Sequence, residues 1–397
     1  MSKHYDWIVI GGGITGAALA YELAKRGVKT LLLDRIPEPQ QASRYSYGGL
    51  GYWLGTKPLA RQLAQEGLAI HRQLTAELGS ETEFCDRPLL ALITPDQDPD
   101  AIAAHQATFD HPFTRLTPAE AGELEPLLNP AAIAAALRIP HAQINPIRTT
   151  AAYRAAFVRL GGSIRNESVL AWNRNGDRII GVTTHAATSP VTYHAPQITL
   201  CAGAWSRPLL QPLGIDPPLY FTHAAGLEFA PDPSLHLNHI IMPALVQRFQ
   251  LEAAASAPAV RPQWREPGHE PAAAILDPGV VQFQDGRILF GQASHTLTSL
   301  EAPLDPVQSE TQLRQTLAQL FPTLAPRAAQ WFHCLVAFSS NPLPQVGHLR
   351  DYDNLSLFSG FSNTLVVTPS LARHFATWAL TGEDEVIPHL GFHLTPE

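Results

Sequence analysis

The sequence predicts an α/β fold in which a parallel sheet is joined to a second part built on a mostly antiparallel sheet. Residues 5–10 (YDWIVI) and 29–34 (KTLLLD) have the apolar character of buried strands, and residues 14–26 between them have that of a helix. A strand, a helix and a strand in succession form a βαβ unit, which requires parallel strands. The dipeptides Asn175-Gly176 and Asp285-Gly286 each separate strand-like runs, as in antiparallel hairpins.

The remaining elements follow from the spacing of apolar residues. Residues 85–140 alternate short apolar runs with proline-rich turns. Residues 253–274 contain mainly Ala, Pro, Gly, Arg and Glu, with Trp264 as the only large apolar side chain. We expect a mobile loop or surface insertion there, with a lid over a substrate site as the alternative. Further helices are expected at 58–78, 149–160, 307–320 and 369–381, and further strands at 167–173, 178–184, 197–201, 219–230, 280–292, 331–338 and 355–359.

The composition places limits on the class of protein. With 397 residues, 45% of them apolar and 16% charged, the chain is typical of a globular protein of two or three domains. The net charge of −8 and the lack of a basic stripe argue against nucleic acid or an anionic membrane surface as a partner. Three scattered cysteines indicate a reducing compartment, and no run of 18 apolar residues predicts a membrane span. We therefore expect a cytoplasmic protein.

A glycine motif carries the strongest chemical signal. Gly11, Gly13 and Gly16 form a G-x-G-x-x-G pattern between the first strand and the first helix. Such glycines permit a tight turn, close approach of the backbone to a pyrophosphate, and close packing of helix on strand. The helix N-terminus attracts phosphates, and Asp34 at the end of the next strand can bind ribose hydroxyls. The motif predicts a Rossmann-like dinucleotide-binding domain but does not distinguish FAD from NAD, and a glycine turn without a ligand remains an alternative.

Five segments in order resemble the family of D-amino-acid oxidase, glycine oxidase and sarcosine oxidase. The first 35 residues resemble its FAD fingerprint, and LCAGAWS at 200–206 resembles the segment that closes its cofactor site. The resemblance covers most of the chain except 86–140 and 230–280. The other matching segments are Ala42-Ser43 with Gly48-Gly49, Asn145-Pro146 through Gly161-Gly162 to Val169, and PLPQVG at 342–347 with Ser359-Gly360-Phe361-Ser362 and Pro369.

This resemblance implies FAD as cofactor and a division into two domains. The FAD-binding domain would comprise 1–85, 141–215 and 331–397, and the substrate-binding domain 86–140 and 216–330. The residue matching Val169 would contact the adenine through its backbone. The implied cofactor-binding residues are Gly11, Gly13, Ile14, Thr15, Gly16, Asp34, Arg35, Ser43, Arg44, Gly48, Gly49, Val169, Ala202, Gly203, Trp205, Cys334, Gly360, Phe361, Ser362, Asn363 and Thr364.

Two positions depart from the family pattern. Amino-acid oxidases of the family commonly carry an arginine, which grips the substrate carboxylate, eight residues before the proline matching Pro344; this chain has Val336. An α-amino-acid substrate must therefore find its cation elsewhere, or the substrate is of another kind. The segment from Asn363 to Leu365 replaces a glycine-rich turn, and leucine does not tolerate the positive φ that glycine allows.

Cys334 raises the question of a covalent cofactor. In sarcosine-oxidase-like proteins a cysteine at the matching position is bonded to the 8α carbon of the flavin. The alternative is a small buried cysteine that fills core volume.

Candidate catalytic residues come from the polar aromatics. Oxidation of an amine requires a neutral nitrogen, so hydrogen-bonding Tyr or His side chains are useful at the flavin. We name Tyr45, Tyr52 and His223 as candidates, each with a structural role as the alternative. His236, Asn238 and His239 lack the further ligands of a metal site and are expected to form a solvated loop.

The leading interpretation is oxidation of the C–N bond of a small amine, imino acid or amino acid. Hydride would pass to flavin N5, water would hydrolyse the imine, and oxygen would reoxidise the flavin. The first alternative is a dehydrogenase for an amino or hydroxy acid that passes electrons to a quinone or carrier. The second is a flavin-binding protein without turnover.

Overall fold

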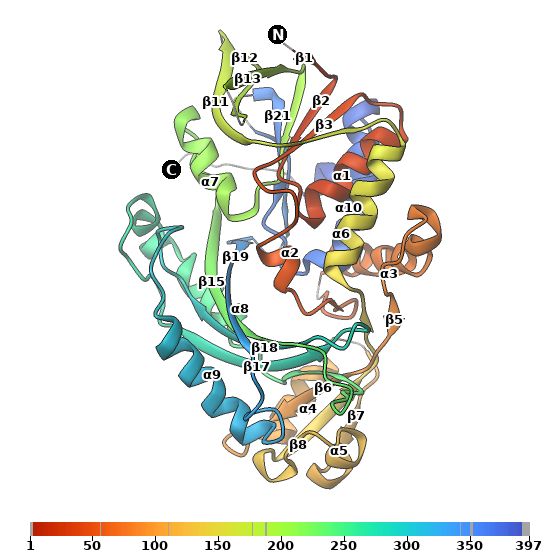
Figure 1. Cartoon of the computed structure of the whole chain (residues 1–397), viewed down its shortest axis with the longest axis vertical. Coiled ribbons are helices and arrows are strands. Elements are labelled where there is room, and N and C mark those ends of the chain that lie inside the picture. The colour runs from red at the N-terminus through yellow and green to blue at the C-terminus, as the bar shows by residue number, and fades with distance from the viewer. Residues whose placement is uncertain are drawn as a thin grey trace.

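The predicted βαβ unit forms the centre of a six-stranded sheet (Figure 1). We describe a computed structural model that covers residues 3–390 except 56, 110, 177, 187, 188, 342, 350 and 351, so Pro342 of the predicted C-terminal motif lies outside the described residues. The sheet order is β10-β3-β2-β14-β21-β20, parallel except for the edge pair β20–β21. Its strands are β2 (Trp7–Ile10), β3 (Thr30–Asp34), β10 (Ser163–Asn166), β14 (Gln197–Leu200), β20 (Gln345–Leu349) and β21 (Tyr352–Ser359).

Helices α1 (Ile14–Lys25), α6 (Pro146–Arg159) and α10 (Thr364–Thr381) lie on one side of this sheet, and α3 (Pro58–Leu78) packs on α10 and α6. Helix α3 spans the predicted residues because Pro58 suits the first turn and Gly79, at φ 58°, ends the helix. Helix α10 begins five residues before the predicted start, with Pro369 inside it. Proline lacks the N–H that would bond to the Leu365 carbonyl, and the buried His71 Nε2 donates to that oxygen instead at 2.8 Å.

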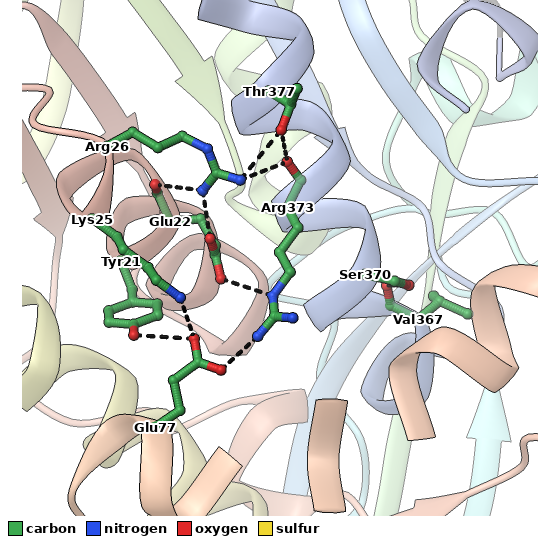
Figure 2. A network of polar contacts seen from close by, with 9 residues as sticks. All are labelled: Tyr21, Glu22, Lys25, Arg26, Glu77, Val367, Ser370, Arg373 and Thr377. Carbon is green, nitrogen blue, oxygen red and sulfur yellow. Dashed lines mark hydrogen bonds and ion pairs between the residues drawn. The ribbon is translucent and has the colours of Figure 1, made fainter. Parts of the chain in front are cut away.

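A network of ion pairs joins α1, α3 and α10 (Figure 2). The buried Glu22 on α1 binds Arg26 at 2.5 Å and Arg373 of α10 at 3.2 Å. Glu77 on α3 accepts from Lys25 at 2.7 Å and from Arg373 at 2.5 Å. The carboxylates are thus neutralised at the point where three helices meet, which fixes their packing.

An eight-stranded sheet forms the second part of the molecule (Figure 1). Its order is β19-β15-β18-β17-β16-β6-β8-β7, and all its pairs are antiparallel except β6–β16. Helix α9 (Pro306–Leu320) packs Leu313 and Leu317 against one face. The strands are β6 (Leu89–Ile93), β7 (Thr114–Leu116), β8 (Ala135–Ile139), β15 (Leu219–Phe229), β16 (Ile240–Pro243), β17 (Ile275–Gln282), β18 (Ile288–His295) and β19 (Gln330–Ser339).

Smaller elements complete the fold. Both hairpins predicted at Asn175-Gly176 and Asp285-Gly286 are confirmed, as β11–β12 and β17–β18. One small sheet holds β1 (Lys3–His4), β11 (Ser168–Asn175), β12 (Arg178–His185) and β13 (Pro190–His194), and another β4 (Gly49–Leu50), β5 (Cys85–Asp86) and β9 (Ala142–Gln143). The short helices are α2 (Ala42–Tyr45), α4 (Pro99–Ala107), α5 (Pro118–Leu124), α7 (Ser206–Leu210), α8 (Arg248–Ala255) and 3₁₀ turns at Pro130–Ala132, Gly203–Trp205, Gln211–Leu213, Pro258–Arg265 and Ile387–His389.

Two loop expectations are wrong in part, although residues 266–274 have no regular secondary structure and His236 and Asn238 are exposed, as expected. Residues 253–265 are not a loop, because they end α8 and continue as a 3₁₀ helix. Trp264 anchors the segment: it is 3% exposed, contacts Tyr220 and Phe221, and donates to the Ala255 carbonyl at 2.8 Å. His239 is not solvated.

His239 is instead buried against Glu125. The Glu125 carboxylate accepts from the His239 backbone N–H at 3.1 Å and lies 3.3 Å from its Nδ1. This long-range pair explains the error, since nothing near His239 in the sequence signals Glu125.

The division into two domains stays a prediction. One boundary strand lies across it: β19, expected in the FAD-binding domain, pairs along β15 in the eight-stranded sheet. None of the described helices combines the length and apolar character needed to cross a bilayer.

Candidate functional site: two adjoining cavities

A cavity of about 330 Å³ lies at the carboxyl ends of the parallel strands. Ile10, Asp34, Cys201 and Ser359, at or just after the ends of β2, β3, β14 and β21, all line it. Ligands of open α/β sheets bind at this edge. The other lining residues are Gly11, Gly13, Ile14, Thr15, Leu33, Arg35, Ile36, Pro39, Gln40, Gln41, Ala42, Ser43, Glu167, Ser168, Val169, Ala202, Gly203, Ala204, Trp205, Leu209, Leu335, Val336, Ala337, Gly360, Phe361 and Thr364.

The glycine turn has no room for side chains. A Cβ on Gly11, at φ 103°, would lie 2.5 Å from the Cys201 carbonyl oxygen. A Cβ on Gly16 would lie 1.8 Å from the Gly11 oxygen. The turn therefore packs tightly against β14 and leaves its backbone open toward the cavity.

The start of α1 presents polar backbone groups at this turn. Its N-cap is Gly13, which has no side chain to cap the helix, and no acidic residue occupies the first turn. The Ile14 N–H donates to Ser43 Oγ at 3.0 Å, and the Gly12 N–H to Asp34 Oδ2 at 2.6 Å. A helix start of this kind favours an anionic group, and the second oxygen of Asp34 accepts from the Ile36 N–H at 3.2 Å.

One end of the cavity is suited to a nucleoside. The Arg35 guanidinium lies 3.9 Å from the centre of the Trp205 ring, which gives two stacked planar groups in the wall. Val169 lines the same cavity beside Glu167, and Ala202 and Gly203 belong to the loop that carries Trp205. The nucleotide-binding roles of these residues stay predictions.

The other end is formed by β19 and the start of α10. Val336 and Ala337 face Gly360, Phe361 and Thr364 in the lining of the cavity. Gly360 has φ 73°, so it supplies the one positive φ of this turn. Leu365 lies within α10, and the loss of the family's glycine-rich turn therefore imposes no strained φ on it.

A second cavity of about 270 Å³ adjoins the first at Phe361. Its wall includes Ser362 and Asn363, which the sequence assigned to the cofactor site. Asn363 Nδ2 donates to the Gly51 carbonyl at 2.7 Å and so ties the start of α10 to the loop before α3. The remaining lining residues are Leu54, Gly55, Lys57, Ala60, Leu63, Phe109, Phe249, Leu343, Pro344, Val367 and Leu371.

Several predicted cofactor residues do not line either cavity. Arg44 binds Glu228 on β15 at 3.2 Å. Gly16 lies behind the glycine turn, while a Cβ added to Gly48 would meet the Ile144 carbonyl and one added to Gly49 the His141 ring.

Cys334 also lies outside both cavity walls. It is a free cysteine, 3% exposed, and burial raises the pKa of its thiol to about 12. The reactive thiolate is therefore scarce at neutral pH.

The structure does not bring the three catalytic candidates together. Tyr45 stacks on Phe332 with ring centres 4.2 Å apart, and Tyr52 meets His111 edge-on at 5.3 Å. Both tyrosines pack on the sheet face opposite α9, and burial raises the pKa of Tyr52.

His223 points elsewhere. Its Nε2 donates to the Ser299 carbonyl at 2.9 Å, and its Nδ1 lies 3.0 Å from His333 Nε2. Burial, with the neighbouring His333, lowers the pKa of His223 to about 4, so the ring is neutral. The catalytic roles of all three residues stay predictions.

Sequence reasoning missed several residues of the walls. Gln41 lines the first cavity and accepts from the Leu335 N–H at 3.0 Å, which joins the loop before α2 to β19. Lys57 and Phe249 line the second cavity. A signal existed for Lys57, because it is one of only four lysines and directly precedes Pro58 at the start of a predicted helix.

A Rossmann-like cradle beside a second cavity defines the class of a dinucleotide-binding oxidoreductase. Residues 6–378 match the family model described as FAD dependent oxidoreductase, so the chain belongs to that family. It is therefore an FAD-dependent oxidoreductase, as the resemblance in the sequence predicted.

Named relatives cover nearly the whole chain. It is 26% identical to the glycine oxidase of Pseudomonas aeruginosa, with 96% of each chain covered. It is 25% identical to the 4-methylaminobutanoate oxidase (formaldehyde-forming) of Paenarthrobacter nicotinovorans, covering 96% of this chain but only 44% of that oxidase. The glycine oxidase structure from Geobacillus kaustophilus has the same fold, with a TM-score of 0.79, 20% identity and 100% of both chains covered.

The residues around the first cavity fit FAD. The glycines of the turn have no side chains that would cover its backbone. The first turn of α1 has no acidic residue, and Asp34 lies at the end of the neighbouring strand β3. Each of these features suits a diphosphate linked to a ribose.

Proposed function

We propose that the chain oxidises the C–N bond of a small amine, imino acid or amino acid, with FAD held in the first cavity. The observation that carries this proposal is the adjoining pair of cavities, one suited to a dinucleotide and one to a small molecule, which share Phe361. The glycine and 4-methylaminobutanoate oxidases among the relatives support the substrate class, since both names denote oxidation of amino acids.

The cofactor would be held by the residues that line the first cavity. Gly11, Gly13 and the start of α1 would bind the diphosphate, Asp34 the ribose, and Val169 with Trp205 the adenine side. Phe361 and Thr364 would flank the flavin ring. When bound, FAD supplies the acceptor of a hydride from the substrate carbon.

The chain's own contribution is orientation and exclusion of water. Phe361, Leu54 and Phe109 form apolar walls that keep the substrate nitrogen from being solvated. A desolvated amine loses its proton more readily, which hydride transfer from its carbon requires. Tyr52, on the loop between Gly51 and Leu54, stays our candidate for hydrogen bonding to that nitrogen.

The proposal is tested by anaerobic titration of the FAD-loaded protein with a panel of amines, N-methyl amino acids and amino acids. Bleaching of the visible flavin band by any member is the expected result. No bleaching across the panel, with full FAD occupancy, would contradict the proposal and favour a flavoprotein without turnover.

The electron acceptor is assigned to oxygen in this proposal. Hydrogen peroxide formed in air, in proportion to substrate consumed, is the expected observation. Reduction of an artificial dye without peroxide would instead favour a quinone or carrier, the acceptor class of a dehydrogenase.

A covalent bond between Cys334 and the flavin is tested separately. Acid precipitation should leave yellow colour in the protein pellet if the bond exists. The burial of the thiol and its raised pKa favour free FAD in the supernatant instead.

We place the reaction in the cytoplasm. All three cysteines are free thiols, which suits a reducing compartment. The partners proposed are small molecules, and the net charge of −8 argues against nucleic acid as a partner.

A further inference from the structure

We propose that the second cavity selects amino acids with a bulky apolar side chain and that Lys57 binds their carboxylate. This inference rests on the proposed function and identifies the substrate class of the same site. It also answers the question raised by Val336, which stands where relatives of the amino-acid oxidase kind place an arginine.

The cavity has one charged side chain in its described wall. Lys57 lines it together with apolar residues from five parts of the chain and with the hydroxyl of Ser362 and the side-chain amide of Asn363. Among the described lining residues no carboxylate offsets the Lys57 ammonium, and no ion pair of Lys57 occurs within the described structure. An unpaired cation at the edge of an apolar cavity is suited to an anionic group of a ligand.

The backbone around Lys57 reinforces its charge. Lys57 is the N-cap of the long helix α3, and Asn363 is the N-cap of α10, so both helices begin at this cavity. In the described chain, neither helix has a capping side chain or an acidic residue in its first turn. The partial positive charges of two helix starts therefore add to that of the lysine.

The rest of the described wall is largely apolar, and the cavity is larger than a glycine molecule needs. Leu54, Phe109, Phe249 and Leu343 contribute to a cavity of about 270 Å³. A branched or aromatic side chain would remove this surface from water, whereas glycine would leave it empty.

Phe249 comes from α8, which packs against β17 of the eight-stranded sheet. Phe249 is 42% exposed, although it lines the cavity. Asp277 of β17 accepts from the Gln247 and Arg248 N–H groups, both at 2.8 Å, and so fixes the start of α8. Phe249 is thereby held in the wall that also includes Leu54 and Lys57, and we infer that it sets the length of side chain that fits.

The first experiment measures binding without turnover. The FAD-loaded protein is titrated with 3-methylbutanoate, which has a branched apolar group and a carboxylate but no amine, and with the uncharged 3-methylbutanamide. Dissociation constants are read from the change in the visible flavin spectrum. We expect the carboxylate to bind more tightly than the amide.

Variants then assign the carboxylate to Lys57. Lys57→Met should weaken 3-methylbutanoate about tenfold and leave the amide within about twofold, because only the charge-assisted contact is lost. Lys57→Arg should keep the affinity within about threefold. Lys29→Met, at an exposed lysine outside the cavity, is the matched control and should change neither constant.

The second experiment concerns the side chain of the substrate. Phe249→Ala should raise KM for the leucine-type substrates that bleach the flavin by about tenfold, with kcat changed less than threefold, because the apolar contact is made before and during reaction. KM for glycine should not change.

Two results would overturn the inference. One is an unchanged affinity of Lys57→Met for 3-methylbutanoate, and the other is glycine turnover with a kcat/KM above that of every branched amino acid. Both results can be obtained while some substrate still bleaches the flavin, and in that case the proposed function would stand although this inference would not. Failure of all substrates to bleach the flavin contradicts the proposed function instead and leaves the binding constants measurable.

Discussion

The two ends of helix α1 are built in opposite ways. Its first turn lies at the glycine motif, has no capping side chain of its own, and faces the first cavity. Its last turn carries Glu22, Lys25 and Arg26, each joined to a partner of opposite charge. Helix α10 repeats this contrast, with an uncapped start at both cavities and Arg373 in the ion-pair network further along.

The two ends of these helices have different roles: one end stabilises the fold, and the other is available to bind a ligand. Uncapped N–H groups cost stability unless a ligand or water satisfies them. The network around Glu22 and Glu77 fixes the same helices at a distance from the cavities, so the open ends can await FAD. Changes at the open end should therefore act on FAD binding, and changes at the paired end on stability.

The largest effect is expected from Gly16→Ala at the open end. Its Cβ would lie 1.8 Å from the Gly11 oxygen, so the turn must shift and the cradle is lost. We expect at least about a hundredfold weaker FAD binding, measured by fluorescence titration of the apoprotein. Gly27→Ala, just beyond the other end of α1 with no atom within 4 Å of its Cβ, is the control.

The control loses only about 1 kcal/mol of stability, from its φ of 81°. Circular dichroism distinguishes a folded Gly16→Ala protein without FAD from an unfolded one. Normal FAD affinity in folded Gly16→Ala would refute the contrast at this end.

The next effect is expected from Arg373→Met at the paired end. The change leaves Glu22 and Glu77 with one cationic partner each, Arg26 and Lys25, and should lower the free energy of unfolding by about 2 kcal/mol. Chemical denaturation of the apoprotein gives this value. The FAD dissociation constant should stay within about twofold of that of the unmodified protein.

Arg72→Met is the matched control, because its ion pair with Asp86 is largely exposed and should contribute less than about 1 kcal/mol. Equal losses in the two variants would mean that the network does not stabilise the helix packing.

A smaller effect is expected from Ser43→Ala. Ser43 Oγ accepts from the Ile14 N–H at the start of α1, and Ser43 lines the first cavity, where we propose that FAD binds. Its loss should weaken FAD binding about threefold to tenfold and change the free energy of unfolding by less than about 1 kcal/mol. FAD is titrated into Ser43→Ala and into the control Ser234→Ala, which changes an exposed serine outside the cavity. An equal FAD affinity of the two variants would mean that the FAD diphosphate does not bind beside Ser43.

The smallest effect concerns pH. Burial alone would raise the pKa of Glu77, but the hydrogen bond from Lys25 and the charges of Arg373 and Lys25 lower it overall. A carboxyl with a depressed pKa in the folded state stabilises the fold above its unfolded pKa, and this contribution is lost as the pH falls through the folded value. Glu77→Gln should therefore be less stable than the parent at pH 7, with the difference shrinking below about pH 4.

Denaturation curves at several pH values check this expectation. A difference between Glu77→Gln and the parent that grows as the pH falls would contradict the assigned direction of the pKa.

Much of the fold was predictable because its signals are local. The glycine turn, the ends of α3 at Pro58 and Gly79, and the two hairpins are each decided by residues within one or two turns of each other, and they lie where the sequence predicts them. Asp34 was predicted from the glycine motif and Val169 from the family resemblance, and both line the cavity.

The missed features depend on contacts between distant residues. Glu125 and His239 are 114 positions apart, and Gln41 reaches Leu335 across 294 positions. The second cavity collects Lys57, Phe109, Phe249 and Leu343 from separate elements, so no single window of the sequence contains it. Trp264 packs under β15 and makes a helical turn of a segment whose composition indicated a loop.

The strand order of the parallel sheet has a consequence for biosynthesis. Strand β2, which carries the glycine turn, pairs with β14 nearly two hundred residues later, and β14 pairs with β21. A ribosome must therefore release about nine tenths of the polypeptide before Gly360 and Thr364 can close the last wall. Until then the emerging chain has the glycine turn but not the complete wall of the first cavity. We therefore expect FAD to bind only after synthesis is nearly complete.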